Sequence, residues 1–332
     1  MISYPLGVGA VRTRVIEAGA GDRAVILIHG VGARADRFRG NLEAFAAAGY
    51  HAYALDLPGH GFADKGLAFP YSVPAYADFV RGAMDALGVG DAVLIGSSLG
   101  GHVVAWLACD TPERARALIL VGAVGLSPLS PAEREAIARN AIDTSPTGIE
   151  RKLRYVLCEH ALITPEWIEE EARVNNSPGA AAAFEALARY FRDPGGIATH
   201  GVIDRLTPIV RRVPTLLVWG KGDNSVPLAV GEQSAAMLGG VPLVALDGAG
   251  HQPYLERAEE FNRAVFEFLS EGASTAPSDG SIDSSRGERR RSPRRPPTGD
   301  ARRPSSQDDC AGEAGARTAS NPGTRRRGTD GT

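Results

Sequence analysis

The sequence has few cysteines and no long apolar run. Cys109, Cys158 and Cys310 are the only cysteines among 332 residues, and they show neither paired spacing nor the His/Cys clustering of a zinc site. We therefore expect reduced thiols and no metal. No apolar run reaches the roughly 18 to 20 residues that cross a bilayer, and residues 1–14 lack the apolar segment of a signal peptide. These absences predict a cytoplasmic protein without membrane contact.

Large apolar residues are scarce in the last part of the chain. Residues 272–332 are rich in Ser, Pro, Gly and Arg, and such a composition cannot bury enough surface to offset chain entropy, which predicts a disordered tail. This segment holds 12 Arg against 8 Asp and Glu, so residues 1–271 are acidic. Arg clusters attract nucleic-acid phosphates, but acidic residues interrupt these clusters and no aromatic platform accompanies them. A solvated tail is favoured over nucleic-acid binding.

Short apolar runs recur along residues 1–271 and end at Gly, Asp or His. They occupy residues 24–29, 51–56, 92–96, 117–122, 215–220 and 242–247. Such runs are typical of strands buried on both faces of a parallel sheet. Most are separated by segments with helical spacing, as in right-handed crossover units, whereas residues 11–19 alternate as an antiparallel strand does. The pattern predicts an α/β fold with a doubly wound, mostly parallel sheet.

One interval, residues 125–212, breaks this rhythm. It has no comparable apolar run but four segments with helical spacing, at residues 130–142, 148–158, 164–174 and 179–191. A structureless loop of that length is improbable in a compact domain, so we predict a helical cap between core segments 1–124 and 213–271. Four aromatic residues are candidates either for a pocket wall or for packing inside the cap: Trp167, Phe184, Tyr190 and Phe191.

Two adjacent serines follow one of the predicted strands. Gly96, Ser98 and Gly100 fit G-x-S-x-G between a strand and a helix, the context in which this motif presents a nucleophile. The turn strains the backbone at the serine, and side chains two residues before and after it would collide. Ser97 fails this test because larger residues stand at those offsets. Ser98 is therefore the candidate nucleophile.

A serine hydroxyl needs a base, and the base needs an acid that fixes its tautomer. Where the order along the chain is serine, acid, histidine, the acid follows a late strand and the histidine follows the last one. Asp223 follows the run at residues 215–220, and His251 follows the run at residues 242–247. These two are the candidate acid and base, and Asp247, four residues before the histidine, is the rival acid.

Two backbone N–H groups are candidates for an oxyanion hole. One belongs to Leu99, the residue after the candidate nucleophile, and the other to Val31, in the loop after the run at residues 24–29. Gly30 and Gly32, on either side of Val31, are small enough to let this backbone approach a substrate.

Five motifs join these candidates into one pattern: HGVG, DLPGHGFAD, GSSLGG, LLVWGKGDNSVP and GAGHQPYLERAEEFNRAVFEFL. With them, residues 1 to about 270 resemble the α/β-hydrolase superfamily. The resemblance implies an eight-stranded sheet with a helical cap after the sixth strand. It also implies Ser98, Asp223 and His251 as a triad that needs neither a metal nor an organic cofactor. Epoxide hydrolases and haloalkane dehalogenases of this superfamily have aspartate in the turn between strand and helix. The serine at position 98 therefore argues against both.

Within this superfamily the sequence is similar to the meta-cleavage-product carbon-carbon hydrolases. Those enzymes carry Asn before and Met after the serine, and Gly-His-Trp in the last motif, where this chain has Ser97, Leu99 and Gln252. Their cap arginine, which binds the acidic end of the substrate, matches Arg173 only with a shifted alignment. The resemblance implies hydrolysis of a small-molecule substrate at a carbonyl, either at a carboxylic ester or at a carbon-carbon bond.

Two alternatives stay open at this point. A cofactor-free perhydrolase has the same triad, and a non-catalytic protein of this fold binds small ligands without turning them over. The sequence predicts no particular oligomeric state.

Overall fold

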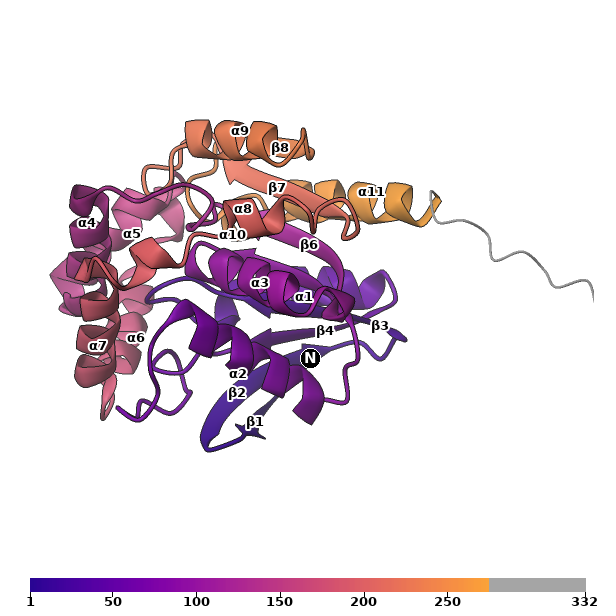
Figure 1. The fold of residues 1–332 in the computed structure, drawn as a ribbon. Coiled ribbons are helices and arrows are strands. Elements are labelled where there is room, and N and C mark those ends of the chain that lie inside the picture. The colour runs from indigo at the N-terminus through magenta and orange to yellow at the C-terminus, as the bar shows by residue number, and fades with distance from the viewer. Residues whose placement is uncertain (275–332) are drawn as a thin grey trace, which may run out of the picture. The chain divides into compact units, whose positions relative to one another are not determined.

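One eight-stranded sheet lies at the centre of the structure, a computed structural model that describes residues 1–274 (Figure 1). Its strands are β1 (Ile2–Val8), β2 (Val11–Ala18), β3 (Arg23–Ile28), β4 (Tyr50–Leu55), β5 (Ala92–Ser97), β6 (Ala115–Val121), β7 (Thr215–Gly220) and β8 (Leu243–Leu246). Their order is β1-β2-β4-β3-β5-β6-β7-β8. β2 pairs antiparallel with both β1 and β4, and all other neighbours are parallel. The predicted doubly wound, mostly parallel sheet is confirmed.

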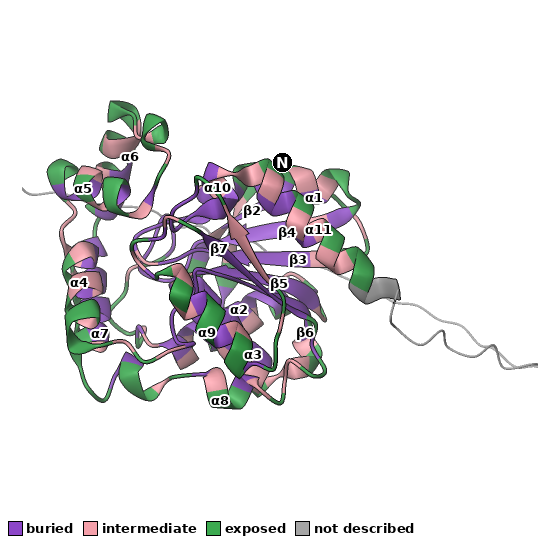
Figure 2. Cartoon of the chain, turned by 90° about the horizontal axis from the view of Figure 1, so that it is seen from above, coloured by how far each residue is buried: buried purple, intermediate pink, exposed green. Residues whose placement is uncertain are grey.

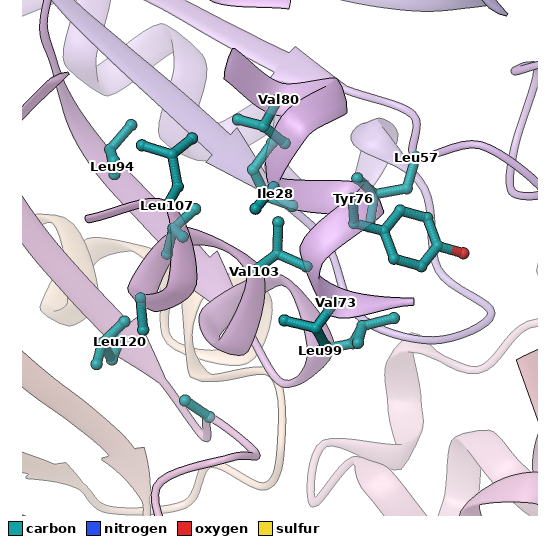
Figure 3. Close-up of a cluster of buried hydrophobic side chains, with 14 of the residues drawn as sticks. Ile28, Leu57, Val73, Tyr76, Val80, Leu94, Leu99, Val103, Leu107 and Leu120 are labelled. Carbon is teal, nitrogen blue, oxygen red and sulfur yellow. The ribbon is translucent and has the colours of Figure 1, made fainter. Parts of the chain in front are cut away.

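Helices cover both faces of this sheet. One face carries α2 (Val73–Ala86), α3 (Leu99–Asp110), α8 (Ile203–Leu206) and α9 (Leu228–Met237), and the other carries α1 (Arg39–Ala47), α10 (Pro253–Glu256) and α11 (Ala258–Ser274). The central strands are therefore buried on both sides (Figure 2), which is why they appear in the sequence as continuous apolar runs. Figure 3 shows Val80 of α2 and Val103 of α3 packed in one cluster with Ile28 of β3.

Four helices of 11 to 13 residues lie between β6 and β7, where the sequence predicts the cap. They are α4 (Pro131–Ile142), α5 (Pro146–Val156), α6 (Pro165–Asn175) and α7 (Ala180–Arg192), at the left of Figure 1. We call residues 131–192 the helical insertion. Ser130, Ser145 and Thr164 cap α4, α5 and α6 by accepting a backbone N–H, and each precedes a proline at the first helical position. The exact cap boundaries, 125 and 212, stay a prediction.

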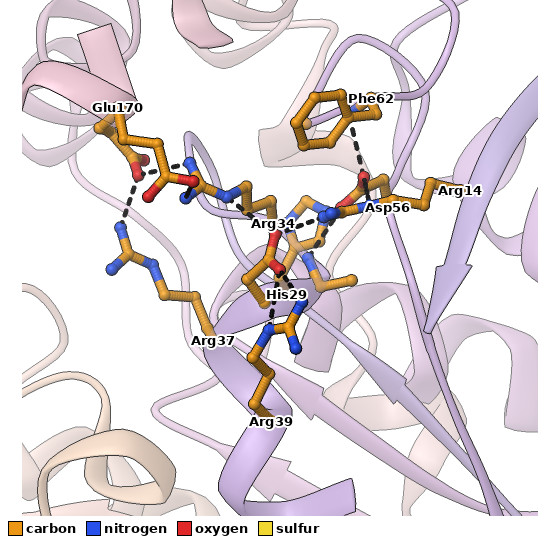
Figure 4. Close-up of polar contacts among 12 residues, drawn as sticks. Arg14, His29, Arg34, Arg37, Arg39, Asp56, Phe62 and Glu170 are labelled. Carbon is orange, nitrogen blue, oxygen red and sulfur yellow. Dashed lines mark hydrogen bonds and ion pairs between the residues drawn. The ribbon is translucent and has the colours of Figure 1, made fainter. Parts of the chain in front are cut away.

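Ion pairs join the helical insertion to the loop after β3. Glu171 of α6 is buried and accepts hydrogen bonds from Arg34 at 3.2 Å and from Arg37 at 2.8 Å. Arg34 also pairs with Glu170 at 2.8 Å and with Asp36 at 2.9 Å (Figure 4). Because removing one partner of a buried ion pair leaves an uncompensated charge, these contacts fix where α6 lies on the core.

The two ends of the predicted organisation need separate comment. Most of the predicted disordered tail, residues 272–332, lies outside the described residues, and its first three residues continue α11. No helix of residues 1–274 is both long enough and apolar enough to cross a membrane.

Candidate active site

The candidate nucleophile Ser98 occupies the turn between β5 and α3. Its φ is +54° and its ψ is −116°, a strained combination for a residue with a side chain. A Cβ on Gly96 would lie 2.2 Å from the carbonyl oxygen of Gly100, and a Cβ on Gly100 would lie 2.3 Å from that of Ile28. The first glycine therefore makes room for the second, as the motif requires, while the second makes room for β3.

The candidate base and acid form a buried hydrogen-bonded pair. His251 Nδ1 lies 2.7 Å from Asp223 Oδ2, and each residue is 6% exposed. The other carboxylate oxygen accepts the N–H groups of Ser225 and Val226, each at 2.8 Å, which fixes the orientation of the acid. Burial by itself lowers the pKa of His251, but the charge and hydrogen bond of Asp223 and the charge of Glu256 raise it above its ordinary value.

A glycine that the sequence analysis did not single out lies against this pair. Gly122, directly after β6, has a φ of +48°. A Cβ there would lie 3.0 Å from Asp223 Oδ2 and 3.1 Å from His251 Nδ1. The rival acid Asp247 makes no such contact, because its side chain is 85% exposed and pairs with Lys221 at 2.9 Å.

Ser98 and His251 line one pocket. Its apolar lining comes mainly from the helical insertion: Ile137, Ala141, Leu153, Val156 and Phe191. Its polar lining includes Arg37, Lys152, Gln252 and Tyr254. Within residues 1–274 no hydrogen bond joins the Ser98 hydroxyl to His251, although both groups line the pocket. The same part of the chain contains no cluster of His, Cys, Asp and Glu able to hold a metal ion.

The two predicted oxyanion donors belong to separate elements, the loop after β3 and the start of α3. Val31 lines the pocket, and Leu99 is the first residue of α3, where the helix dipole favours negative charge. In the described residues neither N–H donates to a loop or turn carbonyl. A Cβ on Gly30 would lie 2.9 Å from the Cβ of Ser98, so this glycine lets the loop approach the serine. Gly32 has a φ of +66°, which favours glycine.

Of the five residues that the sequence offers as pocket candidates in the cap, only one lines the pocket. Arg173 is 77% exposed and pairs with Glu169, one turn earlier on α6, so it does not reach the pocket that Ser98 lines. Of the four aromatic candidates Phe191 lines that pocket. The other three pack elsewhere: Trp167 on the Arg37 guanidinium, Phe184 on His60, and Tyr190 with its hydroxyl accepting the Val73 N–H.

Two cationic side chains that the sequence analysis did not identify, Lys152 and Arg37, line this pocket. Lys152 of α5 places Nζ 3.5 Å from the carbonyl oxygen of Gly32, and no carboxylate of residues 1–274 lies within 4.0 Å of it. Arg37 binds Glu171 through Nη2, but within residues 1–274 its buried Nε has no hydrogen-bond partner, and the same is true of Oε1 of Gln252. The sequence gives no sign that Lys152 and Arg37 line a pocket, because a basic residue on a helix usually faces solvent.

Comparison with known proteins gives a consistent family. Residues 25–264 match the family model described as the alpha/beta hydrolase family. A 2-hydroxy-6-oxononadienedioate/2-hydroxy-6-oxononatrienedioate hydrolase from Burkholderia vietnamiensis is 32% identical over 267 residues, which cover 78% of this chain and 91% of that protein.

Solved structures with the same architecture include enzymes that are named for different substrates. A meta-cleavage product hydrolase from Pseudomonas fluorescens aligns with a TM-score of 0.70 and 25% identity, over 81% of this chain and 98% of that one. Est816, described as an N-acyl homoserine lactone degrading enzyme, aligns with a TM-score of 0.66 and 25% identity, over 80% of this chain and all of that one.

Proposed function

This chain belongs to the alpha/beta hydrolase family, and from that premise we propose that it hydrolyses a small-molecule substrate with Ser98 as nucleophile. His251 acts as the general base and Asp223 as its acid partner. The observation that carries the proposal is the 2.7 Å contact between His251 and Asp223 beside a pocket that also exposes the strained Ser98. A base held by a buried acid at the wall of the nucleophile's own pocket is the arrangement that activates a serine.

In the proposed reaction the Ser98 oxygen attacks the carbonyl carbon while His251 takes the hydroxyl proton. The carbonyl oxygen becomes an oxyanion, to which the N–H groups of Val31 and Leu99 donate. His251 then gives its proton to the leaving group as the bond to that group breaks. Water, deprotonated by the same imidazole, attacks the acyl group and releases an acid and the free serine.

For the scissile bond we propose a carbon-carbon bond next to a ketone, in a substrate that also carries a carboxylate. The relative from Burkholderia vietnamiensis is named for hydrolysis of 6-oxo dioates, compounds with a ketone and two carboxylates. Lys152 and Arg37 supply cationic groups in a pocket whose remaining wall is largely apolar, which supports the same substrate class. Breaking the carbon-carbon bond moves the proton from His251 onto the carbon that leaves.

Loss of visible colour from a ring-fission dienoate tests this proposal. The purified enzyme is expected to bleach 2-hydroxy-6-oxohepta-2,4-dienoate faster, in kcat/KM, than it hydrolyses p-nitrophenyl butyrate. If the Ser98→Ala variant does not bleach the dienoate, the activity is assigned to this site. Persistent colour together with rapid ester turnover would favour ester cleavage, the candidate that the likeness to Est816 supports.

Replacement of Lys152 by glutamine (K152Q) is expected to weaken recognition of an acidic substrate. Losing a hydrogen bond to a charged group costs about 1.5–3 kcal/mol, so kcat/KM for mono-p-nitrophenyl glutarate should fall about 10- to 100-fold. The neutral p-nitrophenyl valerate, of similar length, should react at a rate within about threefold of wild type. K221Q is the matched control, because Lys221 lies outside the pocket and pairs with Asp247. An equal loss on both esters would contradict a role in charge recognition.

A further inference from the structure

The carboxylate of Glu256, in α10, joins two separate loops. Its Oε1 accepts the N–H groups of Gly250 at 2.9 Å and Gln252 at 3.3 Å, the two neighbours of the candidate base. Its Oε2 accepts the N–H groups of Cys158 at 2.6 Å and Glu159 at 3.0 Å, directly after α5. The residue is 7% exposed. A buried carboxylate with four donors in two loops fixes these loops relative to each other.

The segment at residues 155–159, which we call the brace, also contacts the catalytic loops directly. The carbonyl of Val156 accepts the backbone N–H of His251 at 2.7 Å. The carbonyl of Tyr155 accepts the side-chain N–H of Asn224 at 3.3 Å, next to the candidate acid. The brace therefore holds the loop of the base and the loop of the acid, although it belongs to the helical insertion.

From these contacts we propose that Glu256 is a positioning residue, which acts with the brace to hold the His251 imidazole against Asp223 and to stabilise its protonated form. The proposal rests on the function proposed above for His251. It gives the helical insertion a second role besides lining the pocket, because the geometry of the acid-base pair depends on it.

Several charged groups surround this site. Asp223 contacts Nδ1 of the imidazole at 2.7 Å, and its contribution to the raised pKa of His251 exceeds that of Glu256. Arg257 donates through Nη1 to the backbone carbonyl of Glu256 at 2.7 Å and pairs with Glu159 at 3.4 Å. Lys152 and Arg37 are the cationic side chains that line the same pocket as His251.

Replacement of Glu256 by glutamine (E256Q) separates charge and position from packing. The glutamine has the same shape but no charge, and its NH₂ group opposes two of the four backbone donors. The pKa of His251 should fall, because the protonated imidazole loses a stabilising negative charge. The acidic limb of kcat/KM should move to lower pH accordingly. We expect kcat to fall about 10- to 100-fold, with KM little changed, because a small displacement of the base slows the chemical step.

The decisive measurement is an NMR titration of the His251 Cε1 proton, assigned by its loss in H251N. E259Q is the matched control, since Glu259 is exposed and its side chain makes no hydrogen bond within residues 1–274, and it should keep the wild-type pKa and kcat. E256D keeps the charge but shortens the reach, so a lower kcat together with a His251 pKa as high as in the wild type supports the positioning role. E256Q with the pKa and kcat of E259Q would overturn the proposal. The titration needs no turnover, so that result differs from a failure of Ser98-dependent hydrolysis.

Discussion

Replacing Ser98 with alanine is expected to lower kcat/KM for p-nitrophenyl butyrate about a million-fold. In the proposed reaction Ser98 supplies the attacking oxygen, and the residue lies in a strained turn at the wall of the pocket that His251 also lines. Without the Ser98 hydroxyl, the remaining rate acceleration comes from the oxyanion donors and substrate binding. Stopped assays at high enzyme concentration, with the variant purified from a separate column, measure the residual rate without wild-type carry-over.

The matched control is the neighbouring serine. Ser97 is the last residue of β5 and pairs with Val121 in the sheet, so its backbone lacks the positive φ of the elbow. S97A should lower kcat/KM by no more than about tenfold, the effect of one neutral hydrogen bond. Phosphonate labelling followed by peptide mass spectrometry locates the modified serine independently of rates. If S98A kept activity and S97A lost it, the assignment of the nucleophile would be wrong.

Replacing Asp223 with asparagine is expected to lower kcat about 10⁴-fold while leaving the fold intact. The side-chain oxygen of asparagine can still accept the N–H groups of Ser225 and Val226, which anchor the carboxylate now. Its NH₂ group then faces His251 Nδ1, where a donor opposes the imidazole N–H. The imidazole must adopt the other tautomer, whose protonated Nε2 is unable to accept the serine proton.

Asparagine at the rival position provides the comparison for D223N. D247N should have wild-type activity, because Asp247 is largely exposed and pairs with Lys221 rather than with the histidine. Burst kinetics of both variants with an activated ester measure acylation directly. An active D223N enzyme beside an inactive D247N enzyme would assign the acid to position 247.

Much of the fold could be predicted because buried strands appear in the sequence as apolar runs and half-buried helices as helical spacing of apolar residues. β5 and β7 are buried at every residue and β3 at four of six, so they appear as apolar runs with clear ends. β1 was not marked by any run, since most of its side chains are exposed at the edge of the sheet. The four helices of the insertion were predicted from their spacing, and their starts follow from Ser and Thr caps with proline behind them.

The candidate site could be predicted only where a local motif accompanies the residue. Ser98 lies in a turn whose glycines are visible within five residues, and the acid and base follow recognisable strands. Glu256 lies in the same motif as His251, but the motif does not reveal its role, and Lys152 lies in no motif, because their contacts join positions 98 and 120 residues apart along the chain. Arg173 was a candidate from alignment, yet its helical phase directs it to the exposed face that Glu169 shares.

The brace also affects how the pocket of this protein could be redesigned. Exchanging the whole insertion for that of another hydrolase would replace residues 155–159, and a different backbone path there would displace the carbonyl that accepts the backbone N–H of His251. Such a chimaera would combine a new pocket with a His251 side chain that is displaced from Asp223. Crossover points placed inside α5 and after Glu159 would transplant specificity while retaining the native support of the histidine.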